Sequence, residues 1–166
     1  GNVIQVHVQT PENMSGIGVF YAYLDLQVVV PEGLPVEITD SSGDMSVEGV
    51  RVVRITDSSG DITARRLLAD VEINDSSGDV RVEDAAGAVR VEDSSGDVVI
   101  RGAKSVHVPQ DSSGDMIIER IAGDVTIDRD SSGDVFVSDV GGNVEFIADG
   151  SGLVRVTDVK GTVRLP

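Results

Sequence analysis

The sequence predicts an all-β fold, a single-domain parallel β-solenoid (a β-helix or β-roll) with about 18 residues per coil. The first observation is a pentapeptide, Asp-Ser-Ser-Gly-Asp, which starts at Asp40, Asp57, Asp75, Asp93, Asp111 and Asp130, with a degenerate seventh copy from Asp149. Successive copies start 17, 18, 18, 18, 19 and 19 residues apart. The second observation is that short stretches of alternating apolar residues follow each copy. A fixed period of this length is typical of stacked coils that bury a shared core.

Each repeat is expected to contain two turns and two strands. Glycine recurs midway, at Gly87, Gly123, Gly142 and Gly161, nine positions after the glycine of the pentapeptide. Glycine supplies the positive φ of a tight turn, and alternating β-branched residues suit a strand with one buried face. The half-period of nine favours a flattened cross-section with two sheets. A three-faced helix remains the second alternative, although no six-residue spacing is visible.

Five apolar columns define the expected core. Counted from the first Asp of each repeat as position zero, positions five, seven and ten are apolar in all seven repeats. The second strand adds two further columns if its register moves by one residue in repeats one and four. The columns run from Met45, Val47, Val50, Val53 and Ile55 in the first repeat to Val154, Val156, Val159, Val163 and Leu165 in the seventh. Seven coils about 4.8 Å apart predict a rod roughly 34 Å long.

Two outward columns carry further information. At position eight, charges alternate in sign through Glu48, Arg65, Glu83, Arg101 and Glu119. Opposite charges on neighbouring strands stabilise a sheet, so this column supports the same register. At position six, three consecutive coils carry apolar residues where polar ones are expected, namely Val99, Ile117 and Phe136. This stripe predicts either a partner or dimer surface, or the seat of a covering segment from this chain or from a missing part of it.

The first 39 residues differ from the rest. They contain no Lys, no Arg and no copy of the pentapeptide, and strand-like stretches occur at Val3–Val8 and Tyr23–Val30. Pro35–Thr39 already matches the second half of a coil. We therefore expect residues 1–39 to form an N-terminal cap with the first strands, and residues 40–166 to form the seven coils.

Composition excludes several classes of function. The 13 Lys and Arg against 29 Asp and Glu leave a net charge of −16, which argues against nucleic acid and anionic membranes as partners. Without Cys there is no disulfide, thiolate metal site or cysteine nucleophile. The longest apolar stretch, Leu26–Val30, is too short for a transmembrane segment. The chain begins at Gly1, which is compatible with a removed signal peptide.

The pentapeptides stack two acidic columns on one edge, and these are candidate metal ligands. The columns contain Asp40, Asp57, Asp75, Asp93, Asp111 and Asp130, and Asp44, Asp61, Asp79, Asp97, Asp115 and Asp134. Calcium binds Asp carboxylates and turn carbonyls, and the nine-residue calcium β-roll repeat has the same half-period. That repeat has a glycine pair where this chain has Asp-Ser-Ser. The alternative is that Asp and Ser side chains bond the N–H groups of their own turn.

Catalysis has little support in the sequence. His7 and His107 both lie in Val-His-Val, so each is expected to point outward from a strand, without a coupled carboxylate or Ser at a recognisable spacing. The turns are short, and only 3% of the residues are aromatic, which disfavours a sugar-binding cleft. A polysaccharide-active β-helix enzyme is a distant alternative, and no catalytic residue is assigned.

The stretch Leu24–Gly33, followed by repeated Ser-Gly-Asp-Val-x-Val units, resembles the bacterial β-strand-repeat domains of unknown function that are labelled adhesins. The resemblance covers residues 24–166. The related auto-transporter-adhesin head domain is marked by a Gly-Ile-Asn tripeptide, which this chain lacks.

This resemblance implies a non-catalytic structural or interaction module, exported and located in the periplasm or at the bacterial cell surface. Such a module would bind a protein or cell-surface partner, or a second copy of itself, through the ladder faces of the solenoid. The alternative function is a calcium-binding β-roll.

Overall fold

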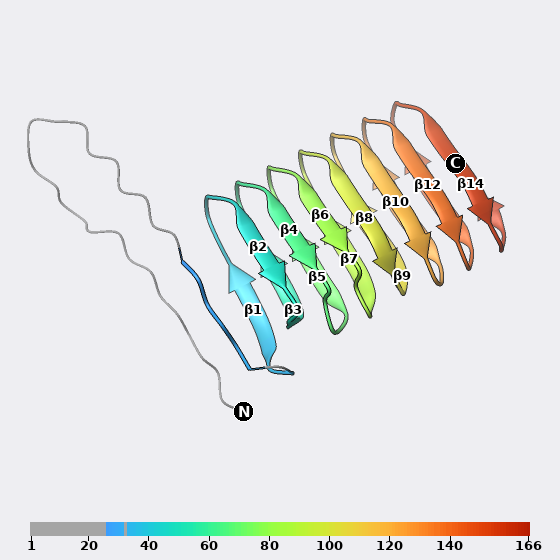
Figure 1. Ribbon diagram of the computed structural model, residues 1–166. Helices are drawn as coiled ribbons and strands as arrows, with labels where there is room; N and C mark the ends of the chain where they lie inside the picture. The colour runs from blue at the N-terminus through green and yellow to red at the C-terminus, as the bar shows by residue number, and fades with distance from the viewer. Residues whose placement is uncertain (1–25, 32) are drawn as a thin grey trace, which may run out of the picture.

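The computed structural model describes residues 26–31 and 33–166, and from Pro35 onward the chain forms a β-solenoid of two parallel sheets (Figure 1). The eight-stranded sheet contains, in spatial order, β1 Pro35–Thr39, β3 Arg51–Thr56, β5 Val71–Asn74, β7 Ala88–Glu92, β9 Ser105–Gln110, β11 Val125–Asp130, β13 Val144–Asp149 and β15 Val163–Arg164. The seven-stranded sheet contains β2 Met45–Glu48, β4 Ile62–Arg65, β6 Val80–Glu83, β8 Val98–Ala103, β10 Met116–Ile121, β12 Val135–Val140 and β14 Val154–Val159.

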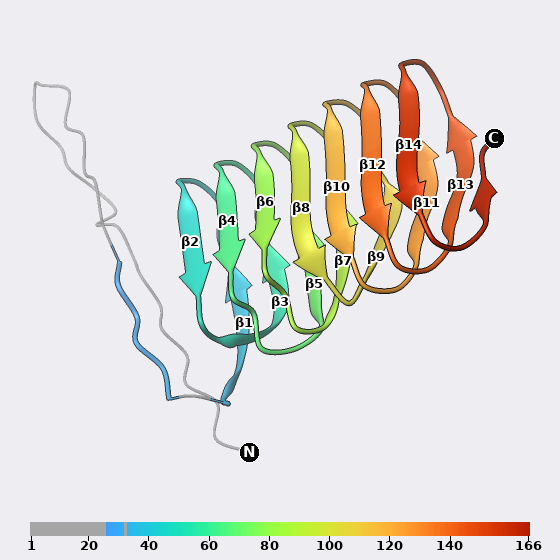
Figure 2. The same cartoon turned by 45° about the vertical axis from the view of Figure 1, so that its right-hand side comes forward.

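The coil winds between the two sheets with a right-handed sense. In Figure 2 the even-numbered strands run down the front and the odd-numbered strands run up behind, while the coils advance to the right. Each strand pairs in parallel with the strand of the next coil, two elements further along the chain. The flattened, two-sheet cross-section is therefore confirmed.

The predicted apolar columns form the core between the sheets. In the central coils their members are fully buried, as Ile73, Ile100 and Ile118 illustrate at 0% exposure. The largest fully buried side chain is Phe146 on β13. Burial decreases in the last coil, where Val163 is 43% exposed. A coil thus depends on both neighbours to exclude water from its inward residues.

The predicted register of the second strand is confirmed in repeats one and four, because Ile55 pairs with Ile73 and Val106 pairs with Val89. An irregularity that was not predicted lies between β1 and β3, where the consecutive residues Val36 and Glu37 pair with Val52 and Arg54 and leave one additional residue on β3. Between β7 and β9 the pairing also shifts, after Arg90. A β-bulge absorbs one additional residue without disturbing the inward columns on either side of it. The side chains of Val52 and Val53 lie outside the described residues.

The expected role of the midway glycines is wrong. None of them has a positive φ; the left-handed residue of this turn lies at position nine, as Gly49, Arg66, Asp84, Gly102, Arg120, Asp139 and Asp158. The midway glycines are required for space instead. A Cβ at Gly87 would lie 2.3 Å from the backbone nitrogen of Asp70 in the preceding coil.

Most of the expected N-terminal cap, including Val3–Val8, lies outside the described residues. Within the described part, residues 26–30 form no strand, contrary to the expectation for Tyr23–Val30. Pro35–Thr39 forms β1 as predicted and pairs with β3. No helix that could cross a membrane occurs in residues 26–31 and 33–166.

Candidate functional site

The first aspartate of each pentapeptide faces the core. It continues the inward alternation of the preceding strand, as Val89, Val91 and Asp93 show. The exposed fractions are 2% for Asp57, 5% for Asp75, 2% for Asp93, 0% for Asp111 and 2% for Asp130. We call these five residues the buried Asp column. The sequence placed all twelve pentapeptide carboxylates on one solvated edge, and for these five that placement is wrong.

Each carboxyl group in the first half of this column caps its own turn. The backbone N–H of Ser94 donates to Asp93 Oδ1 at 2.7 Å, and the equivalent bonds at Asp57 and Asp75 are also 2.7 Å long. This confirms the predicted turn for the Asp side chains, whereas the Ser side chains, which were expected to bond the same turn, do not. The second carboxyl oxygen of these three residues has no hydrogen-bond partner in the described chain. At Asp111 and Asp130 neither oxygen has a partner at full hydrogen-bond geometry, although the backbone N–H groups of the two following serines lie close enough to lower the pKa of each carboxyl group in part.

Burial and stacking disfavour negative charge in the buried Asp column. Two carboxylates about 4.8 Å apart repel by about 3 kcal/mol at an effective dielectric constant of 20. Burial, reinforced by the neighbouring Asp93 and Asp130, raises the pKa of Asp111 to about 7. Burial likewise raises the pKa of Asp93 to about 6, with a smaller contribution from Asp75. The pKa values of Asp75 and Asp130 are also raised, chiefly by burial.

The serines and the glycine of the pentapeptide join one coil to the next. The hydroxyl of Ser95, the second serine of its turn, donates to the carbonyl of Ser76 in the preceding coil at 3.3 Å. The same bond recurs from Ser59, Ser77, Ser113 and Ser132. Gly96 has a φ of 136°, and a Cβ there would lie 1.9 Å from the carbonyl oxygen of Gly78. Both its backbone conformation and its contact therefore require glycine.

The second aspartates are exposed, except for the half-buried Asp134, and make a different bond from the one expected. Asp97 Oδ1 accepts the backbone N–H of Asp115, in the next coil, at 2.9 Å. Equivalent bonds run from Asp61, Asp79, Asp134 and Leu153 back to the preceding second aspartate. These carboxylates, which we call the exposed Asp column (Asp44, Asp61, Asp79, Asp97, Asp115 and Asp134), thus link neighbouring coils instead of capping their own turn.

The calcium site remains a prediction. Within the described ranges, no group of three or more Asp, Glu or His side chains is arranged to hold a metal ion. One oxygen of each residue from Asp44 to Asp134 in the exposed Asp column already accepts a backbone hydrogen bond.

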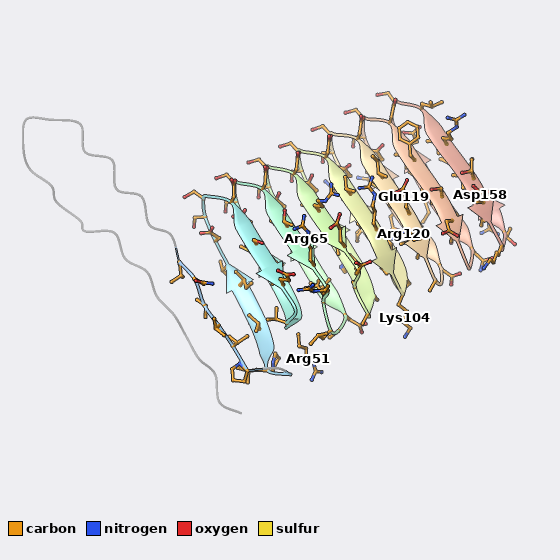
Figure 3. The ribbon with its side chains drawn as sticks, viewed as in Figure 1. Arg51, Arg65, Lys104, Glu119, Arg120 and Asp158 are labelled. Atoms are coloured by element: carbon orange, nitrogen blue, oxygen red, sulfur yellow. The ribbon has the colours of Figure 1, made fainter. Side chains whose placement is uncertain are left out.

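The outer face of the seven-stranded sheet carries both predicted outward columns. Arg65 and Glu119, which are labelled in Figure 3, belong to the charged column. Within it, Arg65 Nε lies 3.0 Å from Glu83 Oε2, and Arg101 Nε lies 2.8 Å from Glu119 Oε2. A hydrogen bond from Arg81, assisted by Arg65, lowers the pKa of Glu83. Because these ion pairs are solvated, they contribute little to the stability of the fold.

The apolar stripe is present on the same face. Ile117 on β10 pairs with Val99 on β8 and with Phe136 on β12, and all three side chains are half-buried. Arginines occupy the same column on both sides, because Arg81 pairs with Val99 and Arg155 with Phe136. The apolar stripe is therefore continuous over three coils and has a cationic boundary at each end.

The opposite face holds a second charged column that sequence reasoning missed. Arg54 Nη2 lies 2.9 Å from Glu72 Oε2, and Glu72 Oε1 lies 3.6 Å from Arg90 Nε. The alternation Arg54, Glu72, Arg90 at one position of successive repeats was the available signal. A shallow hollow of about 590 Å³ lies beside this column, over β5, β7, β9 and β11. It forms where the small residues Ala88 and Ser105 separate Asp70 from Asp124.

His107, which lines this hollow, points outward as expected, but the expectation that it has no coupled carboxylate is wrong. Its Nδ1 lies 3.2 Å from Arg90 Nη1, and its Nε2 lies 3.0 Å from Asp128 Oδ2. Arg can only donate, so Nδ1 accepts and Nε2 donates to the carboxylate. Both ring nitrogens are thus engaged in the surface network. His7 lies outside the described residues.

The chain matches the sequence model of a known protein family. The sequence model described as Toastrack DUF4097 matches residues 1–151. The chain belongs to the Toastrack family. Toastrack is a domain of unknown function, in agreement with the resemblance to β-strand-repeat domains. No curated protein and no solved structure matches the chain.

Proposed function

We propose that this Toastrack domain is a non-catalytic interaction module that binds a protein partner through the apolar stripe. The observation that supports this most directly is the continuity of Val99, Ile117 and Phe136 over three coils of an outer face. Outward positions of a regular solenoid need no apolar residues for folding. An aromatic and two aliphatic side chains flanked by Arg81 and Arg155 match the composition of interface centres, where aromatic residues and Arg are enriched.

The site of action that we propose is the bacterial cell envelope, with a protein or cell-surface partner as the ligand. The support is the resemblance of residues 24–166 to exported β-strand-repeat domains. Adhesion through a ladder face is one form of this function, and self-association is another.

A photo-crosslinking residue placed at position 136, in the natural full-length protein and in its own cells, tests the proposal. We expect crosslinks to another polypeptide chain from Phe136 and none from Thr63. Thr63 occupies the same outward column on β4, outside the apolar stripe, so it is a matched control. The substitution Ile117→Asp in the same protein should abolish the crosslinks from position 136.

Two outcomes would contradict the proposal. Equal crosslinking from positions 136 and 63 would mean that the apolar stripe is not selective. A crosslink within the same chain would mean that a segment of this protein covers it. Cell fractionation of the same material tests the envelope location independently.

A further inference from the structure

The strongest unassigned feature is the buried Asp column, Asp57, Asp75, Asp93, Asp111 and Asp130, at the edge where the core meets the pentapeptide turns. A buried carboxylate normally has a cation or several donors around it. Here each side chain is at least nine-tenths buried, and each has at least one oxygen without a hydrogen-bond partner in the described chain. The outer-face function proposed above does not involve these residues.

The column is continuous from coil to coil. Asp111 and Asp130 form a parallel bridge with each other, and Asp130 pairs with Asp149 in the next coil. Neighbouring members of such a ladder lie about one strand spacing apart. The unpartnered oxygens of successive carboxyl groups therefore belong to adjacent coils of the same edge.

The charged groups near the column do not neutralise it. Within the column, each member faces the like charge of its neighbours. From the exposed Asp column, Asp61 adds negative charge near Asp75, and Asp79 does so near Asp93. Glu92 directly precedes Asp93 and pairs with Arg90. Arg129 precedes Asp130 but is exposed, and no member of the buried Asp column has an ion pair with a described residue.

A proton satisfies such a group in two ways. It removes the charge, and it converts one oxygen from an acceptor into a donor. A protonated carboxyl group can then donate to a carboxyl oxygen of the adjacent coil, which is the partner that each lacks. Metal coordination would need more ligands than one carboxylate per coil supplies, and the described residues provide no such group.

We propose that the buried Asp column is a proton-binding site, in which neutral carboxyl groups of adjacent coils hydrogen-bond to one another along the edge of the core. The raised pKa values agree with this assignment, at about 6 for Asp93 and about 7 for Asp111. The central coils take up these protons as the pH falls from neutral to mildly acidic values.

The sign of the effect on stability follows from linkage. The folded-state pKa values lie above the ordinary value of 3.8, so the folded chain binds protons more tightly than the unfolded chain. The stabilisation is complete below about pH 4 and is lost as the pH rises through 6 and 7. Each proton held only by the folded state changes the unfolding constant about tenfold per pH unit in this range.

Urea unfolding between about pH 5 and about pH 8 tests the proposal. We expect the free energy of unfolding of the wild-type chain to fall as the pH rises across this range. The double variant D93N/D111N should lose most of this pH dependence, because an amide is neutral and can also donate to the next coil. The matched control D97N/D115N, in the exposed Asp column, should retain it. Carbon-13 NMR of the wild-type carboxyl groups supplies a readout that needs no variant, with at least two Asp carboxyls titrating at about pH 6 to 7.

Two results would overturn the proposal. One is the absence of any Asp carboxyl that titrates near neutral pH in the folded wild-type chain. The other is calcium-specific stabilisation at about pH 8 that disappears in D93N/D111N, because the column would then be a cation site.

Discussion

At the scale of single residues, the five positions of the pentapeptide have five different roles. The first Asp faces the core, the first Ser donates its N–H to that Asp, and the second Ser bonds the preceding coil. Glycine provides both a positive φ and the absence of a side chain. The second Asp accepts an N–H from the next coil. Identity of sequence across the repeats therefore reflects identity of contacts within each turn and between neighbouring coils.

Glycine's two roles can be separated by comparing two coils. Gly96 and Gly43 both have a positive φ, but a Cβ at Gly43 meets nothing within 4 Å, whereas at Gly96 it would collide with Gly78. We expect Gly43→Ala to cost about 1–2 kcal/mol from conformation alone. Gly96→Ala should cost roughly 1–3 kcal/mol more. Urea unfolding of both variants measures this difference. Equal losses of unfolding free energy would show that the close contact between Gly96 and Gly78 does not add to the cost of the substitution.

At the scale of strands, the sequence was sufficient to predict the core and its register. The apolar columns and the sign-alternating column at position eight identify which residues pair, and the predicted register of the second strand in repeats one and four is observed. The burial of Asp93 contradicts the expectation that a turn aspartate is solvated, although the alternation through Val89 and Val91 points it inward. The lack of space for a side chain at Gly87 could not be predicted from one repeat, because the crowding comes from Asp70 in the preceding coil.

Two phenylalanines one strand apart test the assignment of inner and outer faces. Phe146 on β13 is 1% exposed, whereas Phe136 on β12 lies in the outward apolar stripe. Phe146→Ala should cost about 3–5 kcal/mol because it leaves a cavity in the core. Phe136→Ala should cost about 1 kcal/mol or less. Thermal or chemical unfolding of the two variants measures this contrast, and similar losses would place Phe136 in a structural role instead of an interface.

At the scale of the whole molecule, the net charge of −16 is concentrated on one edge. Thirteen acidic residues belong to the pentapeptide positions, seven first and six second aspartates, so the other 16 of the 29 nearly balance the 13 bases. Protonation of the buried Asp column reduces this charge further. The exposed Asp column then remains as the chief source of repulsion along the rod.

Salt should therefore stabilise the folded chain. Screening lengths fall from about 20 Å at 0.02 M to about 4 Å at 0.5 M, which is shorter than the spacing between coils. We expect the melting temperature at about pH 6 to rise with NaCl over this range, and to rise less in D97N/D115N. Calcium chloride at the same ionic strength should raise the melting temperature no more than NaCl does. A larger increase with calcium would support the calcium-binding roll.

Because every coil contacts only the coil before it and the coil after it, the number of coils can change without altering the surroundings of the others. Duplicating one repeat in the middle of the chain would lengthen the rod by about 4.8 Å and leave every contact type in place. The distance from the apolar stripe to either end of the domain is therefore adjustable in steps of one coil. Gain or loss of repeats can therefore set the distance between the apolar stripe and the ends of the domain without a change in the fold.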